Sequence, residues 1–314
     1  MKKPLIILTG PTAVGKTKAS IGLAKAVGGE IISADSMQVY KHMDIGSAKI
    51  RAEEMEGVPH HLVDALEPDE EFHVVRFQQM AKEAMEGIYK RGRIPIVVGG
   101  TGFYIQALLY DIDFTESDSD TGYREELERL AKEKGAAFLH GMLKEIDEKA
   151  AGSIHENNVK RVIRALEFHH QTGKKISEHN EEERQKSSPY RSAYFVLSDE
   201  RARLYERIDM RVDQMIEEGL VEEVKGLKER GYTRGMVSMQ GLGYKEILAY
   251  LDGEMSLDEA VYVIKRDTRH FAKRQITWFK RERDVIWLNK QDYAYEETKL
   301  LDQMLSELKI RGII

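Results

Sequence analysis

The 314-residue sequence predicts an α/β protein, in which a parallel sheet core is interrupted by an all-helical insertion. Apolar runs at residues 5–8 and 94–98 are each followed by glycines and then by apolar residues at helical spacing, the pattern of a strand, a loop and a helix. Between residues 113 and 192 only helical periodicity is present. We therefore expect one core from residues 1–112 and 193–314, with residues 113–192 as the inserted helical domain.

The composition is that of an ordinary globular protein, with 41% hydrophobic and 32% charged residues. The absence of cysteine excludes disulfides, thiol catalysis and cysteine-ligated zinc, and it fits a reducing interior. Because the first apolar run is short and serves as a strand, we expect no signal peptide, no membrane span and a cytoplasmic protein. The net charge of −6 argues weakly against a polyanionic partner, but clustered Lys and Arg residues can still form a basic face.

The first glycine loop reads Gly-Pro-Thr-Ala-Val-Gly-Lys-Thr at residues 10–17, between a strand and a helix, which is the context of a P-loop. Its glycines let backbone N–H groups converge on an anion, and Lys16 adds a full charge. The Thr17 hydroxyl is placed to bind Mg²⁺ or phosphate. The alternative is a turn that only joins strand and helix. We predict a P-loop NTPase-like core that binds a polyphosphate or pyrophosphate through Gly10, Thr12, Ala13, Val14, Gly15, Lys16 and Thr17.

Asp35 stands near the end of the second predicted strand, residues 30–36. Strand carboxyl ends of an open parallel sheet border the ligand crevice, so Asp35 should lie near whatever the P-loop holds. We interpret it as a general base or a magnesium partner; the alternative is a carboxylate that caps the following turn. The adjacent His60 and His61 form a poor chelate, so we expect a structural or substrate-side role for them.

A second glycine junction, Gly-Gly-Thr-Gly at residues 99–102, follows the strand at 94–98. Thr101 could bond a phosphate oxygen or an acceptor group across the crevice, or the glycines could only permit close packing of the next helix. Hydrolytic P-loop motors usually end such a strand with a magnesium-binding Asp. The glycines in its place disfavour an ATPase.

Three helices are expected in the insertion, near residues 123–133, 136–144 and 159–171, after an acidic segment at 115–120. The third has apolar residues on one face and a basic cluster on the other, which is either a solvated surface or a polyanion contact. The basic residues of this face are Lys160, Arg161 and Arg164.

After a strand at residues 193–197, a helix at 200–219 carries Arg211, which could reach back to a phosphate. A long helix at 257–280 has an apolar face and a basic one. The cations of the basic face lie at i+4 spacing and repel one another, which favours an anionic partner such as nucleic acid over the alternative of a solvated face. This predicted basic row is Lys265, Arg269 and Lys273.

Five segments occur in a characteristic order over nearly the whole chain. They are residues 10–17, S-A-D-S at 33–36 with Q-V-Y at 38–40, M-D-I-G-S-A-K at 43–49, V-G-G-T-G at 98–102 and K-R-Q-I-T-W at 273–278. Together they resemble the tRNA dimethylallyltransferase family, also called tRNA isopentenyltransferases, whereas a generic P-loop kinase shares only the first. Eukaryotic members carry a Cys/His zinc finger after the core, so this cysteine-free chain resembles the short bacterial form.

The resemblance implies transfer of the dimethylallyl group from dimethylallyl pyrophosphate to N6 of the adenine 3′-adjacent to the anticodon in tRNA. The P-loop with Mg²⁺ would stabilise the leaving pyrophosphate, and Arg211 resembles the family's pyrophosphate-binding arginine. Asp35 would accept the proton of the amine, and Thr101 would hold the amine or the pyrophosphate. Asp35 and Thr101 are therefore the expected catalytic residues, and Mg²⁺ is the expected cofactor.

The same resemblance implies that the adenine flips out of the anticodon loop into a channel, because chemistry on a base requires its removal from the stack. We expect a monomer, since tRNA needs open access and no dimer seam is visible. The flipped base would be lined by Asp35, Ser36, Met37, Gln38 and Thr101. Contacts with the rest of the RNA are expected from Arg124, Lys160, Arg161, Arg164, Lys273 and Gln275.

Two other functions stay open at this point. A P-loop kinase would transfer phosphate from ATP to a small hydroxyl compound with Asp35 as base, and it must consume ATP, whereas a prenyltransferase should ignore it. A nucleotide-gated RNA-binding module would bind RNA without changing it covalently. Neither accounts for the second and third of the five segments, so prenyl transfer is favoured.

Overall fold

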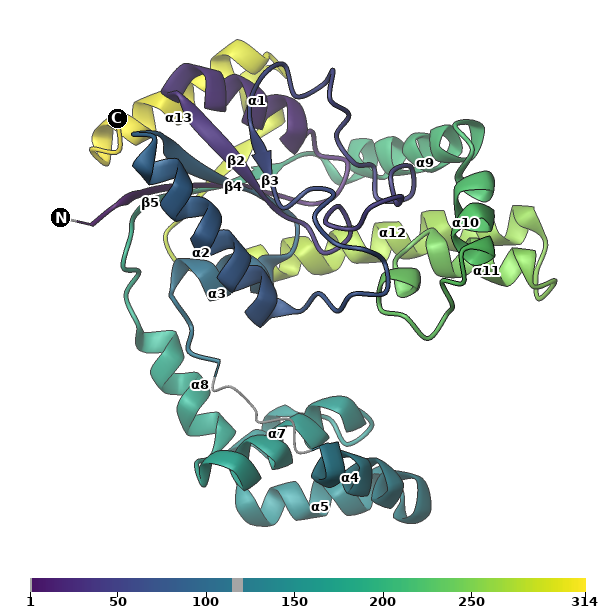
Figure 1. Ribbon diagram of the computed structural model, residues 1–314. Helices are drawn as coiled ribbons and strands as arrows, with labels where there is room; N and C mark the ends of the chain where they lie inside the picture. Colours follow the sequence, from purple (N-terminus) through teal and green to yellow (C-terminus); the bar gives the residue numbers. More distant parts are fainter. Residues whose placement is uncertain (1, 115–120) are drawn as a thin grey trace. The chain divides into compact units, whose positions relative to one another are not determined.

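The computed structural model describes residues 2–114 and 121–314, so the acidic segment at 115–120 lies outside the described residues. The chain divides into two compact units, one joining Met1–Asp111 to Ser188–Ile314 and the other formed by Ile112–Ser187. Figure 1 shows a sheet with helices in the first unit and helices in the second. None of the described helices is long and apolar enough to cross a membrane.

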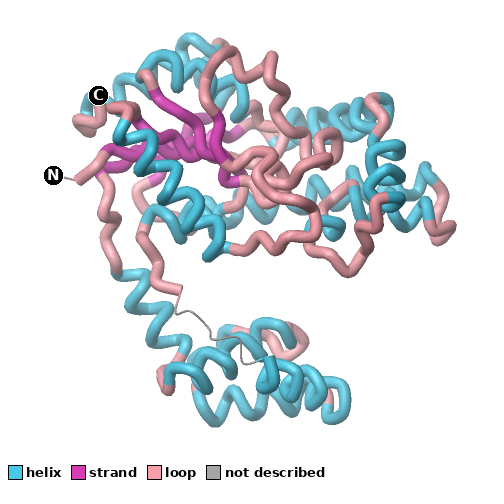
Figure 2. Tube along the Cα trace, in the orientation of Figure 1, coloured by secondary structure: helices cyan, strands magenta, loops and turns pink. Residues whose placement is uncertain are grey.

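Six parallel strands form one sheet in the larger unit, which confirms the predicted fold class (Figure 2). Their order across the sheet is β3-β2-β4-β1-β5-β6. The register pairs Gly99 with both Thr9 and Ala34, so the three central strands end at the same edge. The strands are β1 Pro4–Thr9, β2 Gly29–Ala34, β3 His60–His61, β4 Ile94–Gly99, β5 Arg191–Ser198 and β6 Val285–Asn289.

Helices cover both faces of the sheet, because successive strand residues point to opposite faces. Ile7 and Val97 belong to one apolar core, and Ile6 and Ile96 belong to the other. The α-helices of this unit are α1 Lys16–Val27, α2 Val74–Lys90, α3 Gly102–Leu109, α9 Arg201–Glu217, α10 Leu220–Glu229, α11 Tyr244–Leu251, α12 Leu257–Phe279 and α13 Glu297–Ile310. Two 3-10 turns, η1 Ser238–Gln240 and η2 Lys290–Tyr293, complete it.

The smaller unit has a separate apolar core, to which Leu127, Leu143 and Leu166 contribute. The three predicted helices are present as α4, α5 and α7, whereas α6 and α8 are additional to the prediction. The apolar face of α7 packs inward, and its basic face is directed away from that core. The helices are α4 Thr121–Lys134, α5 Ala136–Ile146, α6 Glu148–Ser153, α7 Val159–Thr172 and α8 Ile176–Gln185.

Candidate active site

The P-loop joins β1 to α1 at the carboxyl edge of the sheet. Gly10 lies so close to β5 that an added Cβ would stand 2.5 Å from the carbonyl oxygen of Leu197. Gly15 precedes α1 with a left-handed φ of 101°, which glycine adopts without strain. The first N–H groups of α1, at Lys16 and Thr17, have no intrahelical acceptor. The loop therefore offers backbone donors and positive helix potential to an anion.

Lys16 folds back over the loop, where its Nζ donates to the carbonyl oxygens of Gly10 at 3.0 Å and Pro11 at 2.9 Å. Burial lowers the pKa of Lys16 to about 8; the Asp35 carboxylate opposes this shift and Arg211 adds to it. The P-loop lysine, the carboxylate and the arginine therefore lie close enough to sense one another's charge.

Two further cations from distant parts of the chain bond the same loop. Arg207 of α9 donates from Nε to the Ala13 carbonyl at 2.8 Å, and Lys290 of η2 donates from Nζ to the Val14 carbonyl at 3.3 Å. The sequence analysis predicts Arg211 and misses both. Arg207 lies one helical turn before Arg211, a signal that the sequence contains, whereas Lys290 follows a strand that the sequence analysis does not predict.

The pKa shifts of these cations have a common cause. Burial lowers the pKa of Arg211, which Asp35 opposes and Arg207 reinforces. Burial also lowers the pKa of Lys290, again with a contribution from Arg207. Lys16, Arg211 and Lys290 are half-buried and each has a neighbouring cation that lowers its pKa further, so a bound polyanion would relieve this repulsion.

Asp35 uses its two carboxylate oxygens differently. Its Oδ1 accepts from the backbone N–H groups of Met37 at 2.9 Å and Gln38 at 3.4 Å, so the turn-capping alternative is correct for this atom. No hydrogen bond to its Oδ2 occurs within residues 2–114 and 121–314. One oxygen therefore fixes the side chain while the other stays available to a substrate proton.

Thr101 follows β4, which lies between β2 and β1 in the sheet, so it stands between Asp35 and the P-loop. Gly99 permits the close strand pairing, because a Cβ there would lie 2.2 Å from the carbonyl oxygen of Ala34. The Thr101 N–H donates to that same oxygen at 3.2 Å. Its half-buried hydroxyl makes no hydrogen bond to any described residue, so it can serve a substrate.

Gln38 is held by the loop of residues 43–49. Its Oε1 accepts from the Ser33 hydroxyl at 3.4 Å, and its Nε2 donates to the Ala48 carbonyl at 3.2 Å. Ser36 and Met37 are half-buried beside it. The orientation of the Gln38 amide therefore depends on where the loop lies.

That loop is anchored by Glu223 of α10. One carboxylate accepts from three successive backbone N–H groups, of Asp44 at 2.8 Å, Ile45 at 2.7 Å and Gly46 at 3.1 Å. The Tyr244 hydroxyl donates to the same carboxylate at 2.8 Å. The sequence analysis does not identify this anchor, because it joins residues about 180 positions apart.

Gln275, predicted to contact tRNA, is buried in the structure. The side chain is only 6% exposed, and both ends of its amide bond backbone groups of the glycine loops. The expectation that Gln275 contacts tRNA is therefore not supported.

The predicted basic row on α12 is only partly correct. Lys265 pairs with Asp213 at 2.5 Å, and Arg269 pairs with Asp209 at 2.5 Å, both from α9. These pairs join two helices of the protein and leave little charge for an outside partner. Lys273, the third member of the row, is exposed and has no ionic partner among the described residues.

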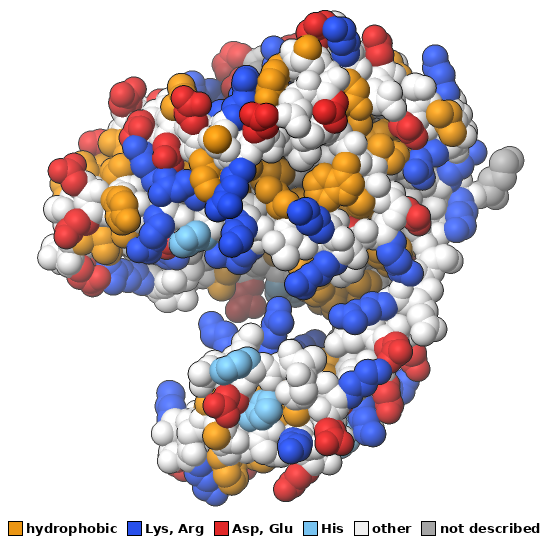
Figure 3. All heavy atoms as spheres, turned by 180° about the vertical axis from the view of Figure 1, so that it is seen from behind, with side chains coloured by type: hydrophobic (Ala, Val, Ile, Leu, Met, Phe, Trp, Pro, Cys, Tyr) orange, Lys and Arg blue, Asp and Glu red, His pale blue; other side chains and the backbone are white. Residues whose placement is uncertain are grey.

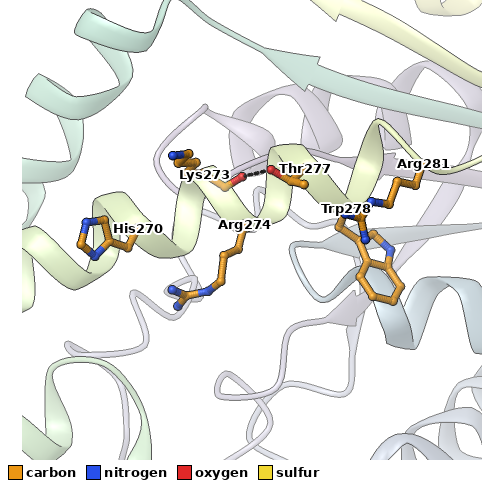
Figure 4. Close-up of a pocket in the computed structure, with 6 residues that line it drawn as sticks. All are labelled: His270, Lys273, Arg274, Thr277, Trp278 and Arg281. Carbon is orange, nitrogen blue, oxygen red and sulfur yellow. Dashed lines mark hydrogen bonds between the residues drawn. The ribbon is translucent and has the colours of Figure 1, made fainter. Parts of the chain in front are cut away.

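The second half of α12 carries a surface pocket of about 440 Å³ (Figure 4). The aromatic ring of Trp278 lies edge-on to Phe103, with ring centroids 6.2 Å apart. Phe103 is exposed and Trp278 is half-buried, and cations beside accessible aromatic rings are typical of surfaces that bind RNA. The lining residues are His270, Lys273, Arg274, Thr277 and Trp278 on one face of α12, and Arg281 in the turn after the helix.

The other predicted RNA contacts lie in the helical unit. Arg124 forms a two-pronged pair with buried Glu167, with both hydrogen bonds 2.7 Å long, so most of its guanidinium serves that unit. Lys160 and Arg161 are exposed, Arg164 is half-buried, and in the described part of the chain none of them has an acidic partner. The basic face of α7 thus keeps its charge.

Thr17 is exposed at the start of α1, and its hydroxyl is free of hydrogen bonds within the described ranges. No group of three His, Cys, Asp or Glu side chains in those ranges could hold a metal alone. A hydroxyl together with phosphate oxygens is nevertheless the donor set that Mg²⁺ takes in P-loop sites. His60 and His61 bond the Val58 carbonyl at 2.8 Å and Glu30 at 2.7 Å respectively.

Comparison with known proteins gives consistent matches. Residues 38–282 match the family described as IPP transferase, and residues 3–66 match isopentenyl transferase. A tRNA dimethylallyltransferase of Lachnoclostridium phytofermentans is 65% identical over 99% of both chains. The crystal structure of the tRNA isopentenylpyrophosphate transferase of Bacillus halodurans is 45% identical, with a TM-score of 0.74 over 99% of this chain and 98% of that one. A eukaryotic dimethylallyltransferase acting on tRNA is 32% identical, with a TM-score of 0.86 over 99% of this chain and 80% of its own.

Inorganic pyrophosphate should bind more weakly as the pH rises above about 8. Lys16 is protonated below that value in the free protein and loses its charge above it, which removes attraction for the anion by up to about tenfold per pH unit. Isothermal titration calorimetry between about pH 7 and about pH 9 measures this. The Lys16→Arg variant stays charged over this range and therefore controls for titration of pyrophosphate itself. If the pyrophosphate affinity of the wild type depended on pH no more than that of the variant, Lys16 would not be the titrating group.

Proposed function

Because the chain belongs to the IPP transferase family, we propose that it is a tRNA dimethylallyltransferase. It transfers the dimethylallyl group of dimethylallyl pyrophosphate to N6 of the adenine 3′-adjacent to the anticodon and releases pyrophosphate. The observation that carries the proposal is the meeting of a cation-rich P-loop, a carboxylate and a free hydroxyl at one sheet edge. The relatives favour this reaction over the alternative of a P-loop kinase.

The P-loop holds the pyrophosphate of the donor. As the bond between carbon and oxygen breaks, negative charge grows on the leaving group, and Lys16, Arg207 and Lys290 already surround the loop that receives it. Arg211 adds a fourth charge from α9. The Thr17 hydroxyl would hold Mg²⁺ together with the substrate's phosphate oxygens, and the metal would supply further charge stabilisation.

Asp35 acts as the general base. The adenine amine is a weak nucleophile, so its proton must leave as the new bond between nitrogen and carbon forms. The free Oδ2 of Asp35 accepts that proton, while Oδ1 keeps the side chain fixed. Thr101 stands between the base and the pyrophosphate, where its hydroxyl orients the amine or bonds the leaving group.

The acceptor adenine is bound by the segment after β2. Ser36, Met37 and Gln38 line the flipped base, and the amide of Gln38 is oriented by its own hydrogen bonds before any ligand arrives. RNA phosphates contact the exposed cations of α12, with Lys273 at their centre, and the basic face of α7. Figure 3 shows Lys and Arg side chains gathered on one face of the larger unit beside exposed hydrophobic side chains.

Arg124 contributes a smaller part of the RNA contact. Its Nε and Nη2 are engaged by Glu167, which leaves Nη1 for a phosphate. We further propose that the protein acts as a monomer in the cytoplasm, where a substrate as large as tRNA can reach an open site.

Nucleoside mass spectrometry tests the reaction directly. Unmodified tRNA with an adenine-rich anticodon loop is incubated with the protein, Mg²⁺ and dimethylallyl pyrophosphate, beside a reaction with ATP alone. A dimethylallyl mass gain on adenosine in the first reaction and none in the second is expected. If adenosine gains no dimethylallyl mass and ATP is consumed once small hydroxyl acceptors are added, the result would favour the alternative of a P-loop kinase.

Substitution of Asp35 tests the base. Asp35→Ala should lower single-turnover prenylation by at least about a hundredfold while tRNA affinity stays near that of the wild type. Asp35→Asn is the sharper variant, because its amide oxygen can still accept from Met37 and Gln38 while the basic oxygen is lost. An unchanged rate in Asp35→Asn would remove Asp35 as the base.

Charge reversal tests the α7 face. Replacing Lys160 and Arg161 with Glu should weaken tRNA binding by about tenfold or more, make its dependence on salt shallower, and leave dimethylallyl pyrophosphate binding nearly unchanged. The matched control reverses Lys132 and Lys144, two exposed lysines of the same unit, and should have a much smaller effect. Equal losses for both substrates would indicate misfolding instead.

A further inference from the structure

Gln275 of α12 joins the two glycine loops of the active site. Its Oε1 accepts from the backbone N–H of Thr12 in the P-loop at 2.9 Å, and its Nε2 donates to the carbonyl of Gly100 at 3.0 Å. The amide has one correct orientation, because the reversed one would face donor to donor and acceptor to acceptor. The buried Gln275 side chain therefore sets the distance between the P-loop and the glycine junction that carries Thr101.

We propose that Gln275 is a positioning residue for prenyl transfer, which aligns Thr101 with the pyrophosphate held by the P-loop. This inference rests on the proposed function, since it assigns Gln275 to that reaction. It also assigns the Thr12 N–H to the protein's own framework instead of to the anion.

The side chain of Gln275 is tightly packed against the glycine junction. We call the two hydrogen bonds of its amide, to Thr12 and Gly100, the Gln275 brace. A Cβ on Gly100 would lie 2.2 Å from the Gln275 Nε2, and a Cβ on Gly102 would lie 2.2 Å from the Trp278 Cδ1. Gly100 and Gly102 therefore both pack closely against α12, at two residues of the helix that lie about one turn apart. Glycine at these positions lets the helix approach the loop closely enough for the amide to reach both backbones.

The two faces of α12 have separate roles at this point of the helix. Lys273 and Arg274 are exposed, whereas Gln275 is buried with both ends of its amide occupied. Its loss should therefore change the alignment of the reacting groups and leave the RNA-facing surface intact. This separation distinguishes the brace from a tRNA contact.

Gln275→Met tests the proposal, because methionine has similar length and no amide. With both substrates saturating, kcat should fall by about ten- to a hundredfold, since misplacement of reacting groups by about 1 Å has effects of that order. The KM for tRNA should stay unchanged. Lys273→Met, on the exposed face of the same helix, is the matched control and should raise the KM for tRNA with little effect on kcat.

Gln275→Glu gives a pH readout that a general loss of packing would not give. A carboxylate can still accept from Thr12 but repels the Gly100 carbonyl, whereas the protonated acid can accept and donate as glutamine does. The rate of this variant relative to the wild type should therefore recover as the pH falls through the pKa of the introduced acid. If the ratio of the variant's rate to the wild-type rate did not change between about pH 5 and about pH 8, the proposed positioning role of Gln275 would be contradicted.

Gly100→Ala disturbs the same contact from the other side, because its Cβ displaces the amide. Its effect on kcat should be non-additive with that of Gln275→Met. Additive effects, or a raised KM for tRNA with unchanged kcat in Gln275→Met, would overturn the proposal. Failure of the proposed function itself is recognised separately, because the wild type would then show no prenylation in the same assay.

Discussion

The structure depends on positive charge concentrated around one backbone loop. Lys16, Arg207 and Lys290 each donate to a P-loop carbonyl, and Arg211 lies within the same field. Burial and then repulsion from the neighbouring cations lower the pKa of Lys16, Arg211 and Lys290. Asp35 opposes the shift for Lys16 and Arg211, and Asp199 and Glu297 oppose it for Lys290. A pyrophosphate carries enough negative charge to relieve this repulsion. The loop is therefore suited to stabilise a leaving group whose charge grows during the reaction.

Sheet topology brings the other proposed catalytic groups, Asp35 and Thr101, close to these cations. In a parallel sheet all strands end at one edge, and the order β2-β4-β1 sets the Thr101 junction between Asp35 and the P-loop. Gly99 and Gly10 make this spacing possible, since a Cβ on either would collide with a neighbouring strand. The position of the proposed catalytic groups follows from strand order and from the absence of side chains at Gly10 and Gly99 as much as from the groups themselves.

The sequence predicts what local pattern and topology determine. The P-loop, Asp35 and Thr101 each follow an apolar strand, so the rule for parallel sheets is enough to bring them together. Contacts between distant segments cannot be predicted from local pattern in this way. Asp209 and Asp213 of α9 pair with Arg269 and Lys265 of α12, so two of the three cations in the predicted basic row are neutralised. For the same reason the sequence does not predict the contacts of Lys290, Glu223 and Gln275, because their partners lie far away in the sequence.

The two sides of the site differ in how their backbone donors are satisfied. On the acceptor side, three successive N–H groups at Asp44, Ile45 and Gly46 are taken by the Glu223 carboxylate, so the protein supplies the anion itself. On the donor side, the first N–H groups of α1 at Lys16 and Thr17 have no intrahelical acceptor. Among the described residues, Lys16, Arg207 and Lys290 beside them donate to carbonyl oxygens and to no carboxylate. The loop that holds Gln38 is consequently satisfied by the protein itself, whereas the proposed pyrophosphate would supply the anion that the P-loop lacks.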